Sequence, residues 1–223
     1  MEYKICAFSQ CFNELQNGNL QRWLKSVKRY CNYICIFNDG STDGSTEILE
    51  KECDIHIHFT HNDWASEIEH KEILLIRCQE ELKDVDAFLW LDMDECLSEN
   101  GIADIQNMVK NMIENHYDAY YFWNINLWKT DKFFRTDSQF YMAYPFVRLW
   151  NAHRKLHFEV KHGLHNQQHP ANIYHTAQSP YFVIHYGFVE PYLSQKYNRY
   201  KEMGQQGFSL ERLNPDAKAE LSP

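Results

Sequence analysis

Short apolar runs alternate with amphipathic segments along the first half of the chain. Strand-like segments cover residues 3–8, 34–37, 55–59 and 88–91, and the segments 34–37 and 88–91 are continuous apolar runs. Elsewhere in this half, apolar residues recur every three or four positions, which predicts helices over residues 20–30, 46–52, 66–82 and 102–115. Strands that alternate with helices are typical of a parallel sheet with right-handed crossovers.

The pattern changes from Ala119 onwards. Residues 119–128 and 139–149 are β-like and rich in aromatic side chains, residues 181–184 form a short apolar run, and residues 192–203 have helical spacing. We interpret this half as a mixed or antiparallel extension that completes the sheet and walls a cleft. The expected fold class is therefore α/β, with a mostly parallel central sheet flanked by helices and this extension beside it.

The length of the chain is compatible with one domain. A chain of 223 residues can bury a single core. We expect one domain over residues 1–203, with residues 1–115 and 116–203 as its two halves. Residues 204–223 are polar and weakly patterned, so we expect a tail or the start of a linker there.

Acidic residues follow the apolar run at 88–91 almost directly. Asp92, Asp94 and Glu95 stand there, and side chains two apart on an extended segment point the same way. Two carboxylates at a strand end are well placed to hold a divalent cation, because Mg²⁺ and Mn²⁺ prefer oxygen ligands and share them with substrate phosphates. The alternative is a solvated acidic turn.

A turn rich in glycine and hydroxyl residues follows the run at 34–37. Residues 38–45 read Asn-Asp-Gly-Ser-Thr-Asp-Gly-Ser, and a helical segment begins behind them. Ser41, Thr42 or Asp43 can cap that helix. Open α/β sheets place ligands beyond strand ends with this order of strand, turn and helix, although an ordinary capped turn has the same residues.

Composition narrows the function classes. The net charge of −9 argues against broad nucleic-acid binding, which needs a basic face. The chain has no run of about 18 apolar residues and no basic-then-apolar start, so we expect neither a transmembrane helix nor a secretory signal. The seven cysteines have no zinc-finger spacing, and we expect reduced, mostly buried thiols that pack as small apolar side chains.

Histidines gather in the second half, where seven of the twelve fall between His153 and His185. Their spacing matches no simple zinc pair, so most are expected to be surface or structural residues, with a zinc site of histidines and carboxylates as the alternative. His185 differs because it directly follows the apolar run at 181–184.

Several segments together resemble the family 2 glycosyltransferases. Residues 38–45 are similar to the family's Asp-Asp-Gly-Ser-x-Asp-Gly-Ser/Thr motif, and Leu-Asp-Met-Asp-Glu at 91–95 is similar to its Asp-x-Asp motif. Residues 9–14 resemble the family's first strand and Asn-Glu turn, and weaker matches are 146–151 and 184–188. The resemblance covers roughly residues 3–203. It implies the GT-A fold, with a nucleotide-sugar-binding half followed by an acceptor-side half.

The resemblance also implies a reaction. A metal-dependent, inverting enzyme of this family would transfer a sugar from a nucleotide-diphosphate sugar, with UDP as the default nucleotide, to a glycan, a lipid-linked acceptor or another hydroxyl acceptor. Asp92, Asp94 and His185 are then expected to hold Mn²⁺ or Mg²⁺ against the diphosphate, with a structural role for His185 as the alternative. Glu95 is expected to support the metal shell or orient the acceptor.

Donor binding is expected to involve the first half of the chain. Asp39 would accept hydrogen bonds from the base or ribose, and the backbone of residues 8–10 would help to form that pocket. Lys196 or Arg199 would add positive charge near the phosphates. The further residues that the resemblance implies in donor binding are Phe8, Ser9, Gln10, Asn13, Glu14, Gly40, Lys71, Asp92 and Met93.

The catalytic base is less clearly marked. Gly163-Leu164-His165-Asn166 resembles a Gly-x-His-Glu segment of many relatives, but Asn166 replaces the acid. An inverting transfer needs a group that takes the proton of the acceptor hydroxyl. The candidates are Glu159, which we prefer, His165 and Asp137, with Asp131 as a further choice.

Two other classes of protein stay open at this point. A Mg²⁺-dependent nucleotidyltransferase could use the same sheet and acids, and the missing acid at Asn166 is compatible with a catalytically weak module that binds nucleotide sugars. The expected location is cytoplasmic, including the face of a membrane where the acceptor is lipid-linked.

Overall fold

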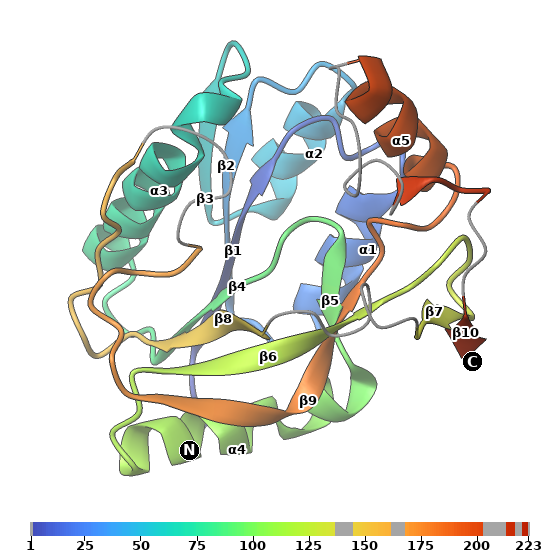
Figure 1. Cartoon of the computed structure of the whole chain (residues 1–223). Helices are drawn as coiled ribbons and strands as arrows, with labels where there is room; N and C mark the ends of the chain where they lie inside the picture. Colours follow the sequence, from blue (N-terminus) through green and yellow to red (C-terminus); the bar gives the residue numbers. More distant parts are fainter. Residues whose placement is uncertain (1, 137–144, 162–167, 203–212, 217–219, 223) are drawn as a thin grey trace.

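A single eight-stranded sheet forms the centre of the computed structural model (Figure 1). The structure describes residues 2–136, 145–161, 168–202, 213–216 and 220–222. The strand order is β3-β2-β1-β4-β8-β6-β9-β5. The strands of the first half pair in parallel, and they are β1 (Ile5–Cys11), β2 (Tyr33–Asp39), β3 (Ile55–Phe59) and β4 (Ala87–Trp90).

The second half extends this sheet with strands of both directions. Its members are β5 (Glu95–Leu97), β6 (Ala119–Asn126), β8 (Pro145–Asn151) and β9 (Thr176–His185). Strand β8 is antiparallel to β4 and β6, β9 is parallel to β6, and β5 is antiparallel to β9. The predicted fold class, a mostly parallel sheet with a mixed extension, is confirmed.

Helices cover both faces of the sheet because the strands alternate their apolar side chains between two core clusters. Ile5 and Ala7 pack with α1 (Asn19–Val27), α2 (Ser45–Glu52) and α4 (Glu99–Glu114). Cys6 and Phe8, which point to the opposite face, pack with α3 (Glu67–Glu81). A short 3₁₀ helix, η1 (Trp64–Ser66), leads into α3.

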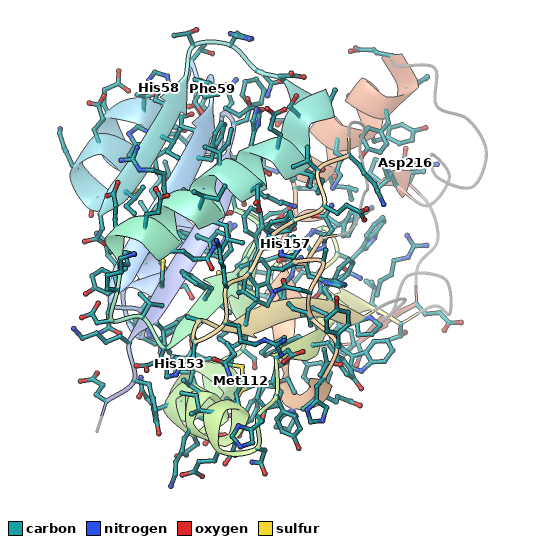
Figure 2. All side chains as sticks on the ribbon, turned by 90° about the vertical axis from the view of Figure 1, so that its left-hand side faces the viewer. His58, Phe59, Met112, His153, His157 and Asp216 are labelled. Carbon is teal, nitrogen blue, oxygen red and sulfur yellow. The ribbon has the colours of Figure 1, made fainter. Side chains whose placement is uncertain are left out.

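The segment after β8 runs along α3, as Figure 2 shows with His153 and His157 labelled. Two backbone amides tie it there. The Leu156 amide donates to Gln79 Oε1 at 2.9 Å, and the Phe158 amide donates to Glu72 Oε2 at 2.7 Å. Residues 156–158 therefore belong to the same layer as α3.

A small third core holds the helix α5 (Tyr192–Glu202) against the domain. Leu193 packs there with Trp128, Phe188 and Leu213. The strand β10 (Leu221–Ser222) pairs with β7 (Phe134–Arg135), so parts of the expected tail contact the domain. Among the described helices, none has the length and apolar character needed to cross a bilayer.

Three element predictions differ from the structure. Glu95 begins a short strand, β5, which the sequence pattern did not predict. Strand β9 begins at Thr176 rather than at the apolar run 181–184, because exposed and buried residues alternate at its start and hide it from a search for apolar runs. Strand β8 begins at Pro145, and residues 139–144 of the predicted segment lie outside the described residues.

Candidate functional site

The polar turns that follow β1 and β2 are bonded to each other. The Asn13 amide donates to Ser41 Oγ at 3.0 Å, and Asn13 Oδ1 accepts from the Thr42 amide at 2.7 Å. Asp43 links the same two turns, because its Oδ2 accepts from the Leu15 amide at 2.9 Å. The residue at the N-cap of α2 is Gly44, whereas Asp43 Oδ1 accepts from the Ser45 amide at 3.0 Å.

Gly40 allows the loop before η1 to pack on the second turn. Its φ is +75°, and a Cβ at this position would lie 2.6 Å from the backbone carbon of His61. A side chain here would therefore displace the loop that covers Asp39. The structure thus gives Gly40 a packing role beside the donor-binding role that we expected.

Asp39 lies under that loop and is only 4% exposed. Its Oδ2 accepts from Asn62 Nδ2 at 2.6 Å, and its Oδ1 accepts from the Asp63 amide at 3.1 Å. Burial raises the pKa of the Asp39 carboxyl, and the Asp63 amide opposes this effect. His70, which we did not predict, places Nδ1 3.7 Å from Asp39 Oδ1 and stacks on Phe37.

Other residues expected in donor binding lie in the core. Phe8 makes edge contacts with Phe88, Trp90 and Trp150, and Met93 is 4% exposed. Ser9 is fully buried, and Gln10 Nε2 donates to the Glu67 carbonyl at 3.1 Å. For Phe8 and Met93, burial leaves mainly the backbone to face a ligand.

Lys71 is a fully buried cation. Its Nζ donates to Glu67 Oε1 at 2.8 Å and to Gln168 Oε1, and it lies 4.5 Å from the centre of the Trp90 ring. Its charge helps to lower the pKa of Asp92. Lys71 therefore interacts electrostatically with Asp92, and its ammonium group already has hydrogen-bond partners of its own.

The two acids Asp92 and Glu95 share one buried arginine. Arg148 Nη2 donates to Asp92 Oδ2 at 3.0 Å and to Glu95 Oε1 at 2.6 Å. Trp90 Nε1 donates to Asp92 Oδ1 at 2.9 Å. Burial would raise the pKa of Asp92, but Arg148, Lys71 and Trp90 together outweigh it and hold that pKa below its usual value. The side chain of Asp92 is still 46% exposed, so one side of it is open to a ligand.

Glu95 is buried and supports the acidic loop of residues 92–95. Its Oε2 accepts from the Asp92 amide at 3.1 Å, and its Oε1 also accepts from Asn124 Nδ2 at 2.9 Å. Burial raises the pKa of Glu95 despite the charge of Arg148. These contacts are those of a residue that supports Asp92.

Asp94 and His185 meet at the end of the sheet extension. Asp94 Oδ2 lies 3.2 Å from His185 Nε2, and His185 Nδ1 lies 2.7 Å from Asn126 Oδ1. An acceptor at Nδ1 favours the tautomer that leaves the Nε2 lone pair for a metal. Burial would raise the pKa of Asp94, but His185 and Lys196 outweigh it and lower that pKa strongly.

The pair fits a divalent cation. Neighbouring ligands of an octahedral ion, each about 2.1 Å from it, are about 3 Å apart, close to the observed separation of 3.2 Å. Gly187 leaves the space open, because a Cβ there would lie 2.5 Å from both Asp94 Oδ2 and His185 Nε2. An imidazole and a carboxylate suit Mn²⁺ among the divalent ions. Asp92, paired with Arg148, is the third residue of the predicted set.

Glu14 stands near this pair. Its Oε2 accepts from Asn17 Nδ2 at 2.7 Å and from Asn19 Nδ2 at 2.8 Å. Burial and the charge of Asp94 raise the pKa of Glu14 to about 7. The first turn, the acidic loop and Lys196 of α5 therefore interact electrostatically.

The base candidates are placed unevenly. Asp137 and His165 lie outside the described residues. Glu159 is 65% exposed at its side chain and pairs with Lys161 at 3.0 Å, directly after the segment tied to α3. Asp131 is exposed and follows Lys129, which forms a bridge to Val189 beside the segment of His185.

The alternative of a zinc site built from histidines and carboxylates has no counterpart among the described residues. Among the described residues, one group of three potential metal ligands has its ligand atoms within 4.8 Å of one another. That group consists of cysteines alone. Arg148, Asn126 and Gly187 were not predicted as site residues, although Arg148 and Gly187 lie in the segments 146–151 and 184–188 that resemble the family.

Comparisons with known proteins agree with the fold. The family model described as glycosyl transferase family 2 matches residues 8–177. No curated protein matches the sequence. Residues 1–349 of TarS from S. aureus share 12% identity and a TM-score of 0.53, over 96% of this chain and 67% of theirs.

A mannosyltransferase from Pyrobaculum calidifontis, PcManGT, in complex with GDP-Man and Mn²⁺, shares 10% identity and a TM-score of 0.52, over 99% of this chain and 66% of its own. The same TarS segment in complex with UDP aligns over 56% of this chain with 14% identity and a TM-score of 0.45. The chain covers 36% of that TarS chain. At these identities the neighbours establish the fold.

Proposed function

The chain belongs to glycosyl transferase family 2, which its residues 8–177 match, and we propose that it transfers a sugar from a nucleotide-diphosphate sugar to a hydroxyl acceptor. The observation that carries this proposal is the Asp94–His185 pair, with its ligand atoms 3.2 Å apart at the end of the sheet. Family membership favours this function over the nucleotidyltransferase that shares the same acids.

The donor would lie across the carboxyl ends of β1, β2 and β4. The turns of Asn13 and Ser41, which are hydrogen-bonded to each other, lie at this edge of the sheet. Asp39 ends β2 and would accept hydrogen bonds from the base or ribose. Asp39 is covered by Asn62 and Asp63, so we propose that this loop is also part of the base pocket. UDP stays the default nucleotide.

Asp94 and His185 would hold Mn²⁺ or Mg²⁺, with Asp92 completing the site directly or through water. A bound ion would neutralise the charge that develops on the leaving diphosphate. Support comes from the mannosyltransferase neighbour, which was obtained with GDP-Man and Mn²⁺. Arg148 and Glu95 hold Asp92 in place, and Gly187 keeps the space beside the pair open.

The acceptor hydroxyl would attack from the face opposite to the diphosphate, with inversion. Glu159, His165 and Asp137 are the proposed proton acceptors. Replacement of each by an uncharged residue ranks them, because loss of the true base lowers kcat by about 100-fold or more. A glycan or a lipid-linked acceptor fits this chemistry equally.

The experiment that tests the function is a thermal-shift panel of nucleotide diphosphates and nucleotide sugars, each with Mn²⁺, Mg²⁺ or EDTA. A ligand that binds only the folded state raises the melting temperature. We expect a metal-dependent rise with one nucleotide sugar, followed by transfer when an acceptor is added. A well-folded sample that shows no shift with any of them would contradict the proposal.

A further inference from the structure

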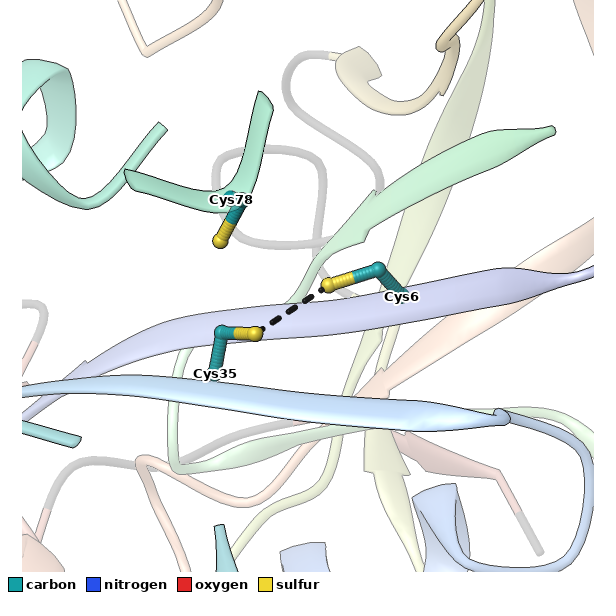
Figure 3. Close-up of side chains that lie close together, drawn as sticks. All are labelled: Cys6, Cys35 and Cys78. Atoms are coloured by element: carbon teal, nitrogen blue, oxygen red, sulfur yellow. Dashed lines mark hydrogen bonds between the residues drawn. The ribbon is translucent and has the colours of Figure 1, made fainter. Parts of the chain in front are cut away.

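Three cysteine side chains converge in the core between α3 and the strands β1 and β2. Cys6 of β1, Cys35 of β2 and Cys78 of α3 point their sulfur atoms toward one another (Figure 3). All three sulfurs lie within 4.8 Å of one another, and Cys6 Sγ lies 3.5 Å from Cys35 Sγ. Each of the three residues is fully buried, and each is a free cysteine.

The surroundings of these sulfurs are apolar. The cluster belongs to the core that includes Phe8, Phe37, Leu74 and Leu75. A buried charge without a partner is costly in such a place. Any ion bound here must therefore prefer sulfur, accept three ligands and leave the core close to neutral.

We propose that Cys6, Cys35 and Cys78 form a binding site for a soft monovalent cation of the Cu(I) class. Thiolate and thioether ligands select Cu(I) and zinc among the biological metals. Structural zinc takes four ligands, whereas the described cluster offers three. Sulfurs about 2.3 Å from a central ion are about 4 Å apart in a trigonal plane, within the spread of the three sulfurs here.

Charge balance favours a monovalent ion. One S–H bond breaks, its proton leaves to the solvent, and one copper–thiolate bond forms, while the other two sulfurs donate lone pairs as neutral thiols. The net charge of the core is unchanged, and nothing is oxidised or reduced.

The site joins three elements that also carry the donor edge. Cys35 lies four residues before Asp39 on β2, and α3 carries both Cys78 and His70, whose ring faces Asp39. An ion at the sulfurs would fasten α3 to β1 and β2. The inference is independent of the proposed transferase activity, because it needs no nucleotide and no acceptor.

The test uses the reduced full-length protein without oxygen and Cu(I) supplied as its bicinchoninate complex. Copper is offered to the folded protein overnight and, in a second arm, during refolding, since the sulfurs are buried. We expect one equivalent of copper per chain to leave the coloured complex in at least one arm, with a rise in melting temperature. X-ray absorption should show sulfur neighbours at about 2.3 Å.

Matched variants distinguish this site from the other cysteines. Cys78→Ala and Cys35→Ala should lose the bound equivalent, whereas Cys31→Ala and Cys53→Ala, whose thiols lie outside the cluster, should retain it. The proposal is overturned if wild type takes no copper in either arm, or if Cys78→Ala takes as much as wild type. Nitrogen or oxygen neighbours in the wild-type absorption spectrum would overturn it even if the variants fail to fold.

Discussion

Asp94 and His185 stand 91 positions apart in the chain, yet Asp94 Oδ2 and His185 Nε2 are 3.2 Å apart. The contact is set by the sheet, because Glu95 of β5 is paired with His185 of β9. The carboxylate comes from the loop that precedes β5, and the imidazole ends β9. The geometry of the proposed metal site is thus a consequence of one antiparallel strand pair.

Asp94→Asn should remove the charged ligand of the proposed site while it keeps the shape of the side chain. We expect Mn²⁺ affinity and metal-dependent kcat to fall by about 100-fold. A Mn²⁺ titration monitored by electron paramagnetic resonance measures the Mn²⁺ affinity without any substrate. Glu114→Gln, at a side chain that is 57% exposed on α4, is the matched control, and an unchanged Mn²⁺ affinity in Asp94→Asn would sink the metal assignment.

Gly187→Ala should block the site without removing a ligand. The added Cβ would lie 2.5 Å from both ligand atoms, so the pair must separate or lose the metal. We expect Mn²⁺ affinity to fall by about 10-fold, with a small loss of thermal stability. Gly101→Ala, whose Cβ would meet Ser98 Oγ and Tyr181 Cβ at 3.2 Å, should bind Mn²⁺ like wild type. Equal affinity in both variants would contradict the prediction.

Arg148→Met should destabilise the fold by about 3–5 kcal/mol, because it leaves the buried carboxylate of Glu95 without its cation. Chemical denaturation measures the free energy of unfolding. Adding Glu95→Gln to this variant removes the unpaired charge, so the double variant should recover part of the loss. A single variant as stable as wild type would mean that the ion pair contributes nothing to the fold.

Glu14 predicts a pH dependence of stability. Burial and the charge of Asp94 raise its pKa from 4.5 in the unfolded chain to about 7 in the fold, so the folded state binds this proton more tightly. Stability should therefore fall as the pH rises from about 4.5 to about 7, by about 3 kcal/mol, and level off above that.

Glu14→Gln carries no such proton and keeps an oxygen for Asn17 and Asn19. Its free energy of unfolding, measured by denaturation at several pH values, should lack this decrease. Parallel pH profiles for the variant and wild type would show that Glu14 titrates normally.

The parallel half of the fold was predictable because β1, β2 and β4 contain continuous apolar runs and β3 alternates apolar residues with histidines, and both patterns indicate strands. Strand β5 was not, since its three residues, Glu95–Leu97, are held by pairing with β9 rather than by their own pattern. The start of β9 was missed for a related reason. Its first residues alternate between the two faces and contain no apolar run.

The candidate site was predictable where a motif stays local. Asp92 and Asp94 follow the strand that presents them, so their position could be read from the sequence. Arg148 could not, because its partner Asp92 is 56 positions away and the two meet only through the pairing of β8 with β4. The cover over Asp39 was also invisible, since it depends on how residues 61–63 fold back on Gly40.

The strand pair of β5 and β9 has a consequence for the order in which the protein matures. A nascent chain that has reached residue 175 contains the parallel strands β1 to β4 and both aspartates of the loop, yet it lacks the imidazole. If β9 then joined one residue out of step, His185 would face the opposite side of the sheet. Metal binding at the proposed site would therefore require that β9 has been inserted in the correct register. A chain that lacks β9, or pairs it out of register, would not bind the metal.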